Sequence, residues 1–300
     1  MMIRYGLEKV IKVQFSFPYY SLNETYGESS PMRLLWTFMG YSKTFNFFTG
    51  LVEIAAGIFL LFKKTKTFGA LLSIAALVNV VVINFSYDVP VKLFATNLLL
   101  IAVFVLSPDI KRVYDFFFRN RAVAAVYVPP NFSKQWMKPA FDVIKFAVMV
   151  SAIYTTTMQI WRKYNISGDA AFNKTPLFGI YTVESFAKEK DSSKTLLTDS
   201  TTWKTLSIIF SKQASIQTID DKIKMYHFYA DTMNKKITLY KDDDSTNKSV
   251  LSYSQNLTQL NLSGKLNNDS VYISLQKQDV NKFPLLERGF HWINEAPYNK

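Results

Sequence analysis

The sequence predicts an α+β protein in which an integral-membrane helical bundle precedes an antiparallel β-barrel or sandwich, a meander of the lipocalin-like kind. Long apolar runs are confined to residues 44–160, whereas residues 165–300 hold most of the Asp, Asn, Ser, Thr and Gln. A hydrophobic content of 49% with a mean hydropathy of only +0.03 fits such a mixture. We expect the bundle in residues 1–162, a linker in 163–177, and a β domain with a C-terminal tail in 178–300.

Four apolar runs predict membrane-spanning helices. About 20 helical residues at about 1.5 Å each match the ~30 Å thickness of the hydrocarbon core. The runs cover residues 44–62, 68–87, 91–106 and 140–160. Buried helices of a soluble protein are the alternative, which is disfavoured because basic loops bracket the runs.

Two shorter helices are expected before the first of these runs. Arg4, Glu8 and Lys12 recur every fourth residue beside an apolar face. This segment is expected either to lie in the membrane interface or to insert as a fifth, short span with its charged stripe turned into the bundle. The stretch SSPMRLLWTFMGYS (29–42) predicts a helix with Ser30 as N-cap, Pro31 at its first position and Gly40 at its end.

The distribution of Lys and Arg predicts the orientation. Lys63, Lys64 and Lys66 follow the first apolar run, and six more basic residues lie in the connection 107–139. Because basic loops stay in the cytoplasm, these loops are expected on the cytoplasmic side and the C-terminal domain on the extracytoplasmic side. No basic stripe is interleaved with stacking aromatics, so the net charge of +12 does not indicate nucleic acid as a partner.

After residue 178 the pattern alternates between apolar and polar residues, which is typical of strands. Turn clusters separate several of these segments. A barrel built from them either holds one small apolar ligand or is packed solid, and the packed form is favoured. The chain has no cysteine and two histidines about 64 positions apart, so no metal site is expected. The eight expected strands are 178–186, 203–210, 214–219, 223–231, 235–241, 249–254, 258–264 and 270–277.

Polar residues inside the apolar runs are the candidate functional residues. Glu53 lies in the middle of the first run, where a charge costs roughly 2.5–3.5 kcal/mol. It is therefore protonated, paired or in contact with water. One interpretation is a proton-accepting carboxylate or ligand contact, and the other is a structural ion pair with Lys9, Lys12 or Lys92.

The stretch NVVVINFSYDVPVKLFATN (79–97) carries the remaining polar residues. Asp88 is expected to cap the third span from a tight turn at YDVP, while Asn79 and Asn97 are expected to hydrogen-bond between helices. A more specific hypothesis is that several polar residues surround a lipid-soluble ligand such as a quinone. Lys92 or asparagine amides would donate to the quinone oxygens, and a carboxylate would relay the proton. This candidate site consists of Glu8, Glu53, Asn84, Asp88 and Lys92.

Several stretches resemble the DoxX family of bacterial membrane proteins. They are SPMRLLWTFMGYS (30–42), FTGLVEIAAGIFLLF (48–62), TKTFGALL (65–72) and NVVVINFSYDVPVKLFATNLLL (79–100), and the ending RGFHWINEAPYN (288–299) is similar to that of long, two-part members. The resemblance implies a small helical bundle in an inner membrane. It also implies a component of a membrane redox system, with a quinone-like molecule or other redox subunits as partners. Whether the chain is an enzyme stays open. The alternative is a non-enzymatic scaffold whose β domain binds a partner protein or envelope lipid.

Overall fold

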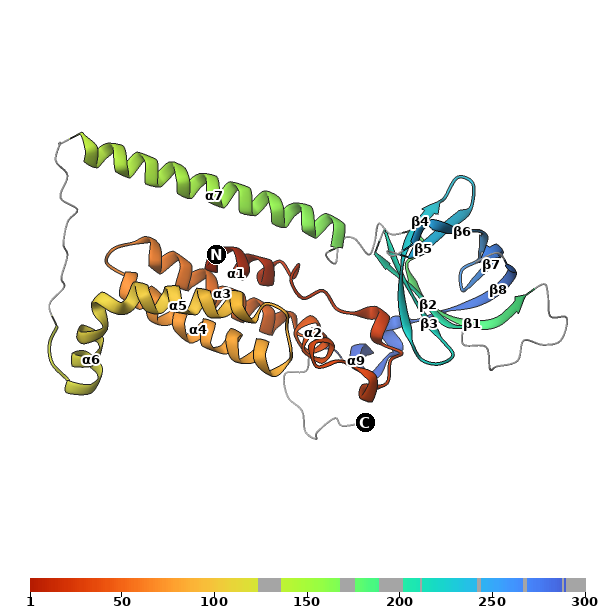
Figure 1. Ribbon diagram of the computed structural model, residues 1–300, viewed down its shortest axis with the longest axis horizontal. Coiled ribbons are helices and arrows are strands. Elements are labelled where there is room, and N and C mark those ends of the chain that lie inside the picture. Colours follow the sequence, from red (N-terminus) through yellow and green to blue (C-terminus); the bar gives the residue numbers. More distant parts are fainter. Residues whose placement is uncertain are drawn as a thin grey trace. The chain divides into compact units, whose positions relative to one another are not determined.

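The computed structural model describes residues 1–123, 136–167, 176–188, 202–210, 212–241, 244–266, 269–287 and 289. The chain forms two compact units. One comprises residues 1–17 and 27–169, and the other comprises residues 18–26 and 170–300. The first is helical and the second is built on a β-barrel (Figure 1).

The helical unit contains four runs that are long and apolar enough to cross a membrane: Lys43–Leu61, Lys66–Ser86, Lys92–Arg119 and Met137–Ile166. Each of them overlaps one of the four spans that the sequence predicts, and the third extends to Arg119, beyond the predicted end at residue 106. The third run is not one straight helix, because a 3-10 turn, η3, separates α5 from α6. The helices of this unit are α1 (Met2–Val10), α2 (Pro31–Tyr41), α3 (Lys43–Leu61), α4 (Lys66–Ser86), α5 (Lys92–Leu106), η3 (Ser107–Asp109), α6 (Ile110–Arg119) and α7 (Met137–Ser167).

Helix α2 begins as predicted and ends differently. The Ser30 hydroxyl accepts a hydrogen bond from the Arg33 backbone N–H at 3.2 Å, and Pro31 occupies the first turn. The prediction that Gly40 ends the helix is wrong, because α2 continues to Tyr41. A Cβ at Gly40 would lie 2.9 Å from the Cα of Phe17, so this glycine permits a close backbone passage.

Helix α1 packs along the middle of α3. A Cβ on Gly6 would lie 2.5 Å from the Gly50 carbonyl oxygen, and a Cβ on Gly57 would lie 2.6 Å from the Ile3 side chain. The two helices run in opposite directions, since early residues of α1 meet late residues of α3. The structure therefore shows that this segment packs on α3 with Glu8 and Lys9 buried, and whether it also inserts as a fifth span stays a prediction.

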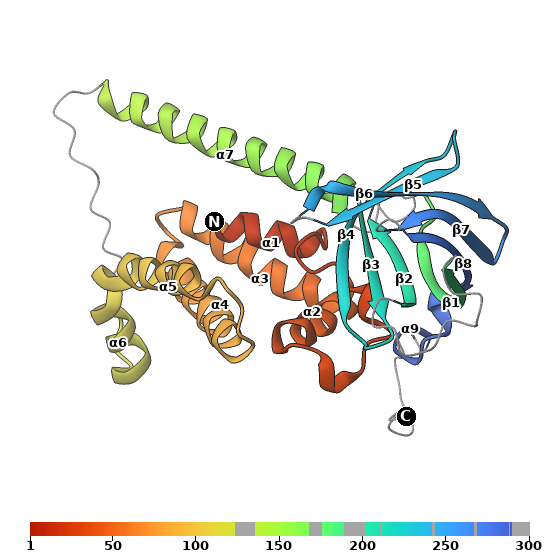
Figure 2. The same ribbon diagram turned by 45° about the vertical axis from the view of Figure 1, so that its right-hand side comes forward.

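The second unit is a closed barrel of eight antiparallel strands in sequential order, so the sandwich alternative is excluded (Figure 2). Pairing of the first strand with the last closes the sheet, from Ile180 opposite Gln278 to Lys188 opposite Val271. The eight segments predicted as strands are confirmed. The strands are β1 (Gly179–Lys188), β2 (Trp203–Phe210), β3 (Gln213–Thr218), β4 (Ile223–Asp231), β5 (Lys236–Lys241), β6 (Asp244–Gln255), β7 (Gln259–Leu266) and β8 (Asp269–Gln278).

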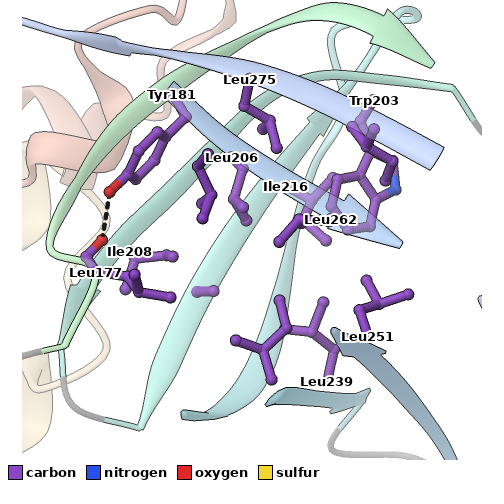
Figure 3. Packing of buried hydrophobic residues seen from close by; sticks show 14 of the residues in the cluster. Leu177, Tyr181, Trp203, Leu206, Ile208, Ile216, Leu239, Leu251, Leu262 and Leu275 are labelled. Atoms are coloured by element: carbon purple, nitrogen blue, oxygen red, sulfur yellow. Dashed lines mark hydrogen bonds between the residues drawn. The ribbon is translucent and has the colours of Figure 1, made fainter. Parts of the chain in front are cut away.

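The barrel interior is filled by its own side chains (Figure 3). All eight strands contribute to this core, in which Leu206, Ile237 and Leu251 have no exposed surface. A water-sized void next to these side chains would expose them, so the packed form that the sequence favours is the one observed around them. Tyr181 is also fully buried and donates a hydrogen bond from its hydroxyl to the Leu177 carbonyl at 2.9 Å. Burial raises the pKa of Tyr181 to about 12.

A short segment between α1 and α2 belongs to the barrel unit. It contains η1 (Tyr19–Ser21), which lies against β2, and its last residue, Tyr26, begins η2 (Tyr26–Glu28). The Tyr19 ring meets the Phe178 ring edge-on at 6.3 Å, and the Asn23 amide donates to the Gln278 side chain at 3.1 Å. After the barrel come η4 (Val280–Lys282) and α9 (Pro284–Glu287). The predicted tail resemblance at 288–299 and His291 lie almost wholly outside the described residues.

Candidate intramembrane charge site

The contact between α1 and α3 brings charged side chains into the bundle. Gly6 and Gly50 have no side chains to separate the two backbones, and a Cβ on either would come within 2.6 Å of the carbonyl oxygen of the other. Small residues allow such close approach between membrane helices. The neighbouring side chains on both helices are consequently enclosed, and they include Glu8, Lys9 and Glu53.

Lys9 and Glu53 form a buried ion pair between the two helices. The Lys9 ammonium donates to Glu53 Oε1, and the two side chains are only 8% and 6% exposed. Helical side chains point toward the N-terminus of their helix, so the long Lys9 side chain reaches back along α1 toward Glu53. This is the structural ion pair that the sequence offers as one of two interpretations. The pair is incomplete, however, because Glu53 Oε2 is buried and has no hydrogen-bond partner.

Glu8 lies next to this pair and has cationic partners of its own. Its Oε1 lies 3.2 Å from Arg4 Nε, one turn earlier in α1, and 3.5 Å from Lys163 Nζ on α7. Glu8 adjoins Lys9 in α1, and Glu8, Lys9 and Glu53 are all buried. The two carboxylates therefore belong to one polar region on the enclosed face of α1.

Ser73 on α4 supplies a further buried polar atom near the depth of Glu53. A Cβ on Gly69 would lie 2.6 Å from the Leu60 backbone nitrogen, which fixes how the antiparallel helices α3 and α4 align. Ser73 lies one turn further along α4 and hence within about one helical turn, ~5 Å, of the depth of Glu53. Its hydroxyl is buried without a hydrogen-bond partner.

Asp88 and Lys92 form a separate, exposed pair. The Lys92 ammonium donates to Asp88 Oδ1, and the Asp88 side chain is 80% exposed. This hydrogen bond, followed by the charge of Lys92, lowers the pKa of Asp88. The expectation that Asp88 caps the third span is wrong, since α5 has Val91 as its N-cap and no side-chain capping bond. Asp88 is directed away because it adopts a left-handed conformation, with φ +52°, in the tight turn.

The asparagines of α4 and α5 differ from one another. Asn84 is buried, and its side-chain amide nitrogen has no partner. Its backbone carbonyl accepts the Val89 N–H at 3.0 Å in the turn that follows α4. Asn79 and Asn97 lie on exposed faces instead. Neither forms a side-chain hydrogen bond with another described residue, so the prediction that they join neighbouring helices is wrong for this chain.

The structure therefore brings together only part of the predicted site. Glu8 and Glu53 share the enclosed face of α1 and α3, whereas Asp88 and Lys92 pair with each other. Lys9 is the central cation, and it entered the sequence analysis only as a partner for Glu53. Sequence reasoning missed Lys163 and Ser73 entirely. A lysine directly beyond an apolar run gave a signal for Lys163, but a lone serine in a span gave none.

No metal site accompanies these residues within the part of the chain that the structure describes, since no three His, Asp or Glu side chains gather there. His227, in β4, stacks on the Tyr240 ring with the centroids 4.7 Å apart. The charge pair between Lys9 and Glu53 supplies the candidate chemistry. A carboxylate hydrogen-bonded to an ammonium in a medium of low dielectric can accept, hold or pass on a proton.

The fold and the site together define a multi-span membrane protein with a buried charge pair and an attached closed β-barrel. Among curated proteins, the uncharacterized protein YwoB of Bacillus subtilis strain 168 is 32% identical over 113 residues, which are 38% of this chain and 72% of that protein. The chain belongs to the same family as YwoB. No family profile matches the chain, and no solved structure matches it.

Proposed function

We propose that this chain is a bacterial inner-membrane component of a redox system and that Lys9 and Glu53 handle protons for a quinone-like partner. The observation that carries the proposal is the incomplete pairing of Glu53. One of its oxygens is bonded to Lys9, and the other is buried in the bundle without a partner. A buried polar atom without a partner is costly, which favours a ligand or water that donates to it.

The residues present fit such a molecule. The Lys9 ammonium has further N–H groups with which to donate to a quinone carbonyl oxygen, and Glu53 Oε2 is free to accept a quinol hydroxyl proton. When the quinol gives up its protons its two electrons would pass to a redox partner of the chain, and in the reverse direction, quinone reduction, that partner would supply them. The resemblance to the DoxX family supports the same assignment, with the site narrowed to Glu8, Lys9 and Glu53 because Asp88 and Lys92 pair with each other elsewhere.

Binding of a short-chain menaquinone tests this assignment. Purified protein in lipid nanodiscs is titrated with the quinone, and quenching of tryptophan fluorescence reports occupancy. We expect Glu53→Gln to weaken binding of the reduced form about tenfold, because a neutral amide oxygen accepts the quinol hydroxyl more weakly than a carboxylate and cannot take up its proton. Asp88→Asn is the matched control, since it neutralises an exposed carboxylate of the original candidate site, and it should bind like the unchanged chain. Equal affinity of both variants would refute the assignment.

The barrel is proposed to lie on the extracytoplasmic side of the membrane. Lys63 and Lys64 precede α4, Lys66 begins it, and Lys111 and Arg112 follow α5, so the two basic stretches share one side of the membrane. By the positive-inside rule that side is cytoplasmic. The chain crosses once more in α7 before the barrel begins, so the barrel is assigned to the extracytoplasmic side.

A second function is favoured by the packed barrel interior. A barrel whose described interior is filled by its own side chains acts through its outer surface, where Met225, Tyr229 and Tyr272 are exposed. Under this alternative the chain is a scaffold that holds a partner protein or envelope lipid outside the membrane. Glu53→Gln would then leave partner binding intact, whereas Tyr229→Ser and Tyr272→Ser would reduce it.

A further inference from the structure

Helix α6 has two chemically distinct faces. At about 100° per residue, Ile110, Val113, Tyr114, Phe117 and Phe118 fall on one side of the helix. Four of these five side chains are exposed, with Phe117 at 61% and Phe118 at 75%. The opposite side carries the charged residues Lys111, Arg112, Asp115 and Arg119. Such a helix, aromatic on one face and basic on the other, is typical of segments that lie flat in a membrane interface.

The position of α6 in the chain places it at that depth. Helix α5 has 15 residues and is about 22 Å long, less than the ~30 Å of hydrocarbon that it enters. A helix of this length that begins at one edge of the core ends about 8 Å short of the other edge, which is the depth at which an interfacial helix buries its apolar face. In Figures 1 and 2 α6 turns away from the axis of α5 at this point.

Asp109 fixes the bend. Its Oδ2 accepts the Thr67 hydroxyl at 2.8 Å, and its Oδ1 accepts Arg112 at 2.7 Å. These bonds tie the first turn of α6 to the first turn of α4, and Lys66 adds a cation 3.6 Å from the same carboxylate. The aromatic face is thus held at the membrane edge by contacts outside α6.

Some charged side chains in and directly after α6 form ion pairs, and others do not. Arg112 is paired with Asp109, and Arg119 lies 3.4 Å from Asp115 and over the Tyr114 ring. Lys111 and Arg121 have no ion-pair partner among the residues that the structure describes. Lys111 lies in the first turn of α6, and Arg121 lies two residues beyond its last residue. Arg121 also lines an open hollow of about 310 Å³ together with Phe116, Phe117, Asn120 and Ala122.

We propose that α6 is a binding surface for anionic phospholipids. The aromatic face inserts among the acyl chains, while Lys111 and Arg121 engage headgroup phosphates and the hollow beside Phe117 and Arg121 accepts one lipid. Charge complementarity selects this occupant, because both unpaired side chains are cationic and a zwitterionic surface offers them no net attraction. The surface is distinct from the Lys9–Glu53 site and does not depend on the function proposed for it.

Site-directed spin labelling tests the placement, and the absence of cysteine from the sequence gives a clean background. Single cysteines replace Val113, Phe117, Lys111 and Asp115 in the full chain, reconstituted in vesicles of phosphatidylcholine with and without phosphatidylglycerol. Labels at 113 and 117 should be accessible to oxygen and shielded from a water-soluble nickel chelate, and labels at 111 and 115 should show the reverse. Shielding from both reagents at 113 and 117 would indicate a protein partner and would overturn the proposal.

Lipid selectivity tests the headgroup contacts. Mixed-lipid nanodiscs are analysed by native mass spectrometry for enrichment of phosphatidylglycerol on the protein. We expect the double variant Lys111→Gln, Arg121→Gln to lose most of the enrichment, at about fivefold per charge. Lys224→Gln with Lys282→Gln removes two exposed charges from the barrel unit and serves as the matched control, with enrichment unchanged. Enrichment that is equal in both double variants, or absent in the unchanged chain, would overturn the proposal.

Discussion

Lys9 and Glu53 show how one residue pair can be both a stabilising element and a candidate site. Each side chain is enclosed between α1 and α3, and each depends on the other for charge compensation. A buried charge without its partner is strongly unfavourable, whereas an apolar pair of similar size is tolerated. The stability of the bundle should therefore respond to the two residues jointly.

A double-mutant cycle measures this dependence. Lys9→Met leaves the Glu53 carboxylate buried without its cation, and we expect a loss of about 3 kcal/mol in the free energy of unfolding. Lys9→Met combined with Glu53→Met removes both charges and should recover most of that loss. Unfolding in mixed micelles with increasing dodecyl sulfate gives the free energies. Glu53→Met alone completes the cycle. Additive effects of Lys9→Met and Glu53→Met would contradict a direct coupling.

Ionisation of Tyr181 makes the stability of the barrel depend on pH in the alkaline range. Burial raises its pKa from 10.0 to about 12, so the folded state favours the neutral phenol. The stabilisation is complete below pH 10 and is lost as the pH rises through the folded-state value near pH 12. We expect the midpoint of urea unfolding of the barrel to fall across this window. Fluorescence of the buried Trp203 is the probe.

Two variants separate Tyr181 from the other tyrosines. Tyr181→Phe should flatten the pH dependence and lower stability at neutral pH by about 1 kcal/mol, since the Leu177 carbonyl loses its hydrogen bond. Tyr229→Phe changes an exposed ring and should retain the pH dependence of the unchanged chain. An unchanged alkaline transition in Tyr181→Phe would assign the effect to another group.

At the scale of elements, the strands and spans were predictable because their signals are local. Alternation with period two, interrupted by turn residues, marked β2 and β4 at both ends, and length with apolarity marked the spans. The rotation of each helix about its axis was not predictable. Asn79 and Asn84 share α4, yet one is exposed and the other buried, and only contacts with distant parts of the chain decide which.

The same dependence on distant contacts explains why only part of the candidate site was predictable from the sequence. Sequence identified Glu53 as a buried carboxylate and named Lys9 among three possible partners. The choice of Lys9 depends on the passage of α1 across α3 at Gly6 and Gly50, which are 44 positions apart. Asp88 and Lys92 looked like site residues because they are close in sequence to apolar runs, but the turn directs them outward.

Replacing Gly50 tests the contact between α1 and α3. A Cβ there would meet the Gly6 carbonyl oxygen at 2.6 Å, so Gly50→Ala should force the backbones apart and cost about 1–3 kcal/mol. Dodecyl sulfate unfolding of the full chain measures the loss. Gly27→Ala is the matched control, since a Cβ at Gly27 meets nothing within 4 Å, and its effect should stay within about 0.5 kcal/mol. Equal stability of both variants would show that the close contact is not required.

At the scale of the whole molecule, the chain enters the barrel unit twice. Residues 18–26 leave the helical unit after α1, contribute to the barrel unit through η1 and Asn23, and return to α2. Residues after α7 then build the barrel itself. Since one folded unit lies on one side of a membrane, the connection between α1 and α2 and the barrel must share a side.

Labelling of single cysteines in intact bacterial cells tests this topology together with the proposed orientation. Asn23→Cys reports the α1–α2 connection and Leu257→Cys, at a side chain that is 97% exposed, reports the barrel. Both should react with a membrane-impermeant maleimide that has crossed the outer envelope, because both are assigned to the extracytoplasmic side. Lys64→Cys, in the basic loop before α4, should react only after the inner membrane is permeabilised. Reaction of Asn23→Cys and Leu257→Cys on different sides of the membrane would show that the α1–α2 connection and the barrel do not belong to one folded unit. Reaction of both only after permeabilisation would reverse the orientation and leave the unit intact.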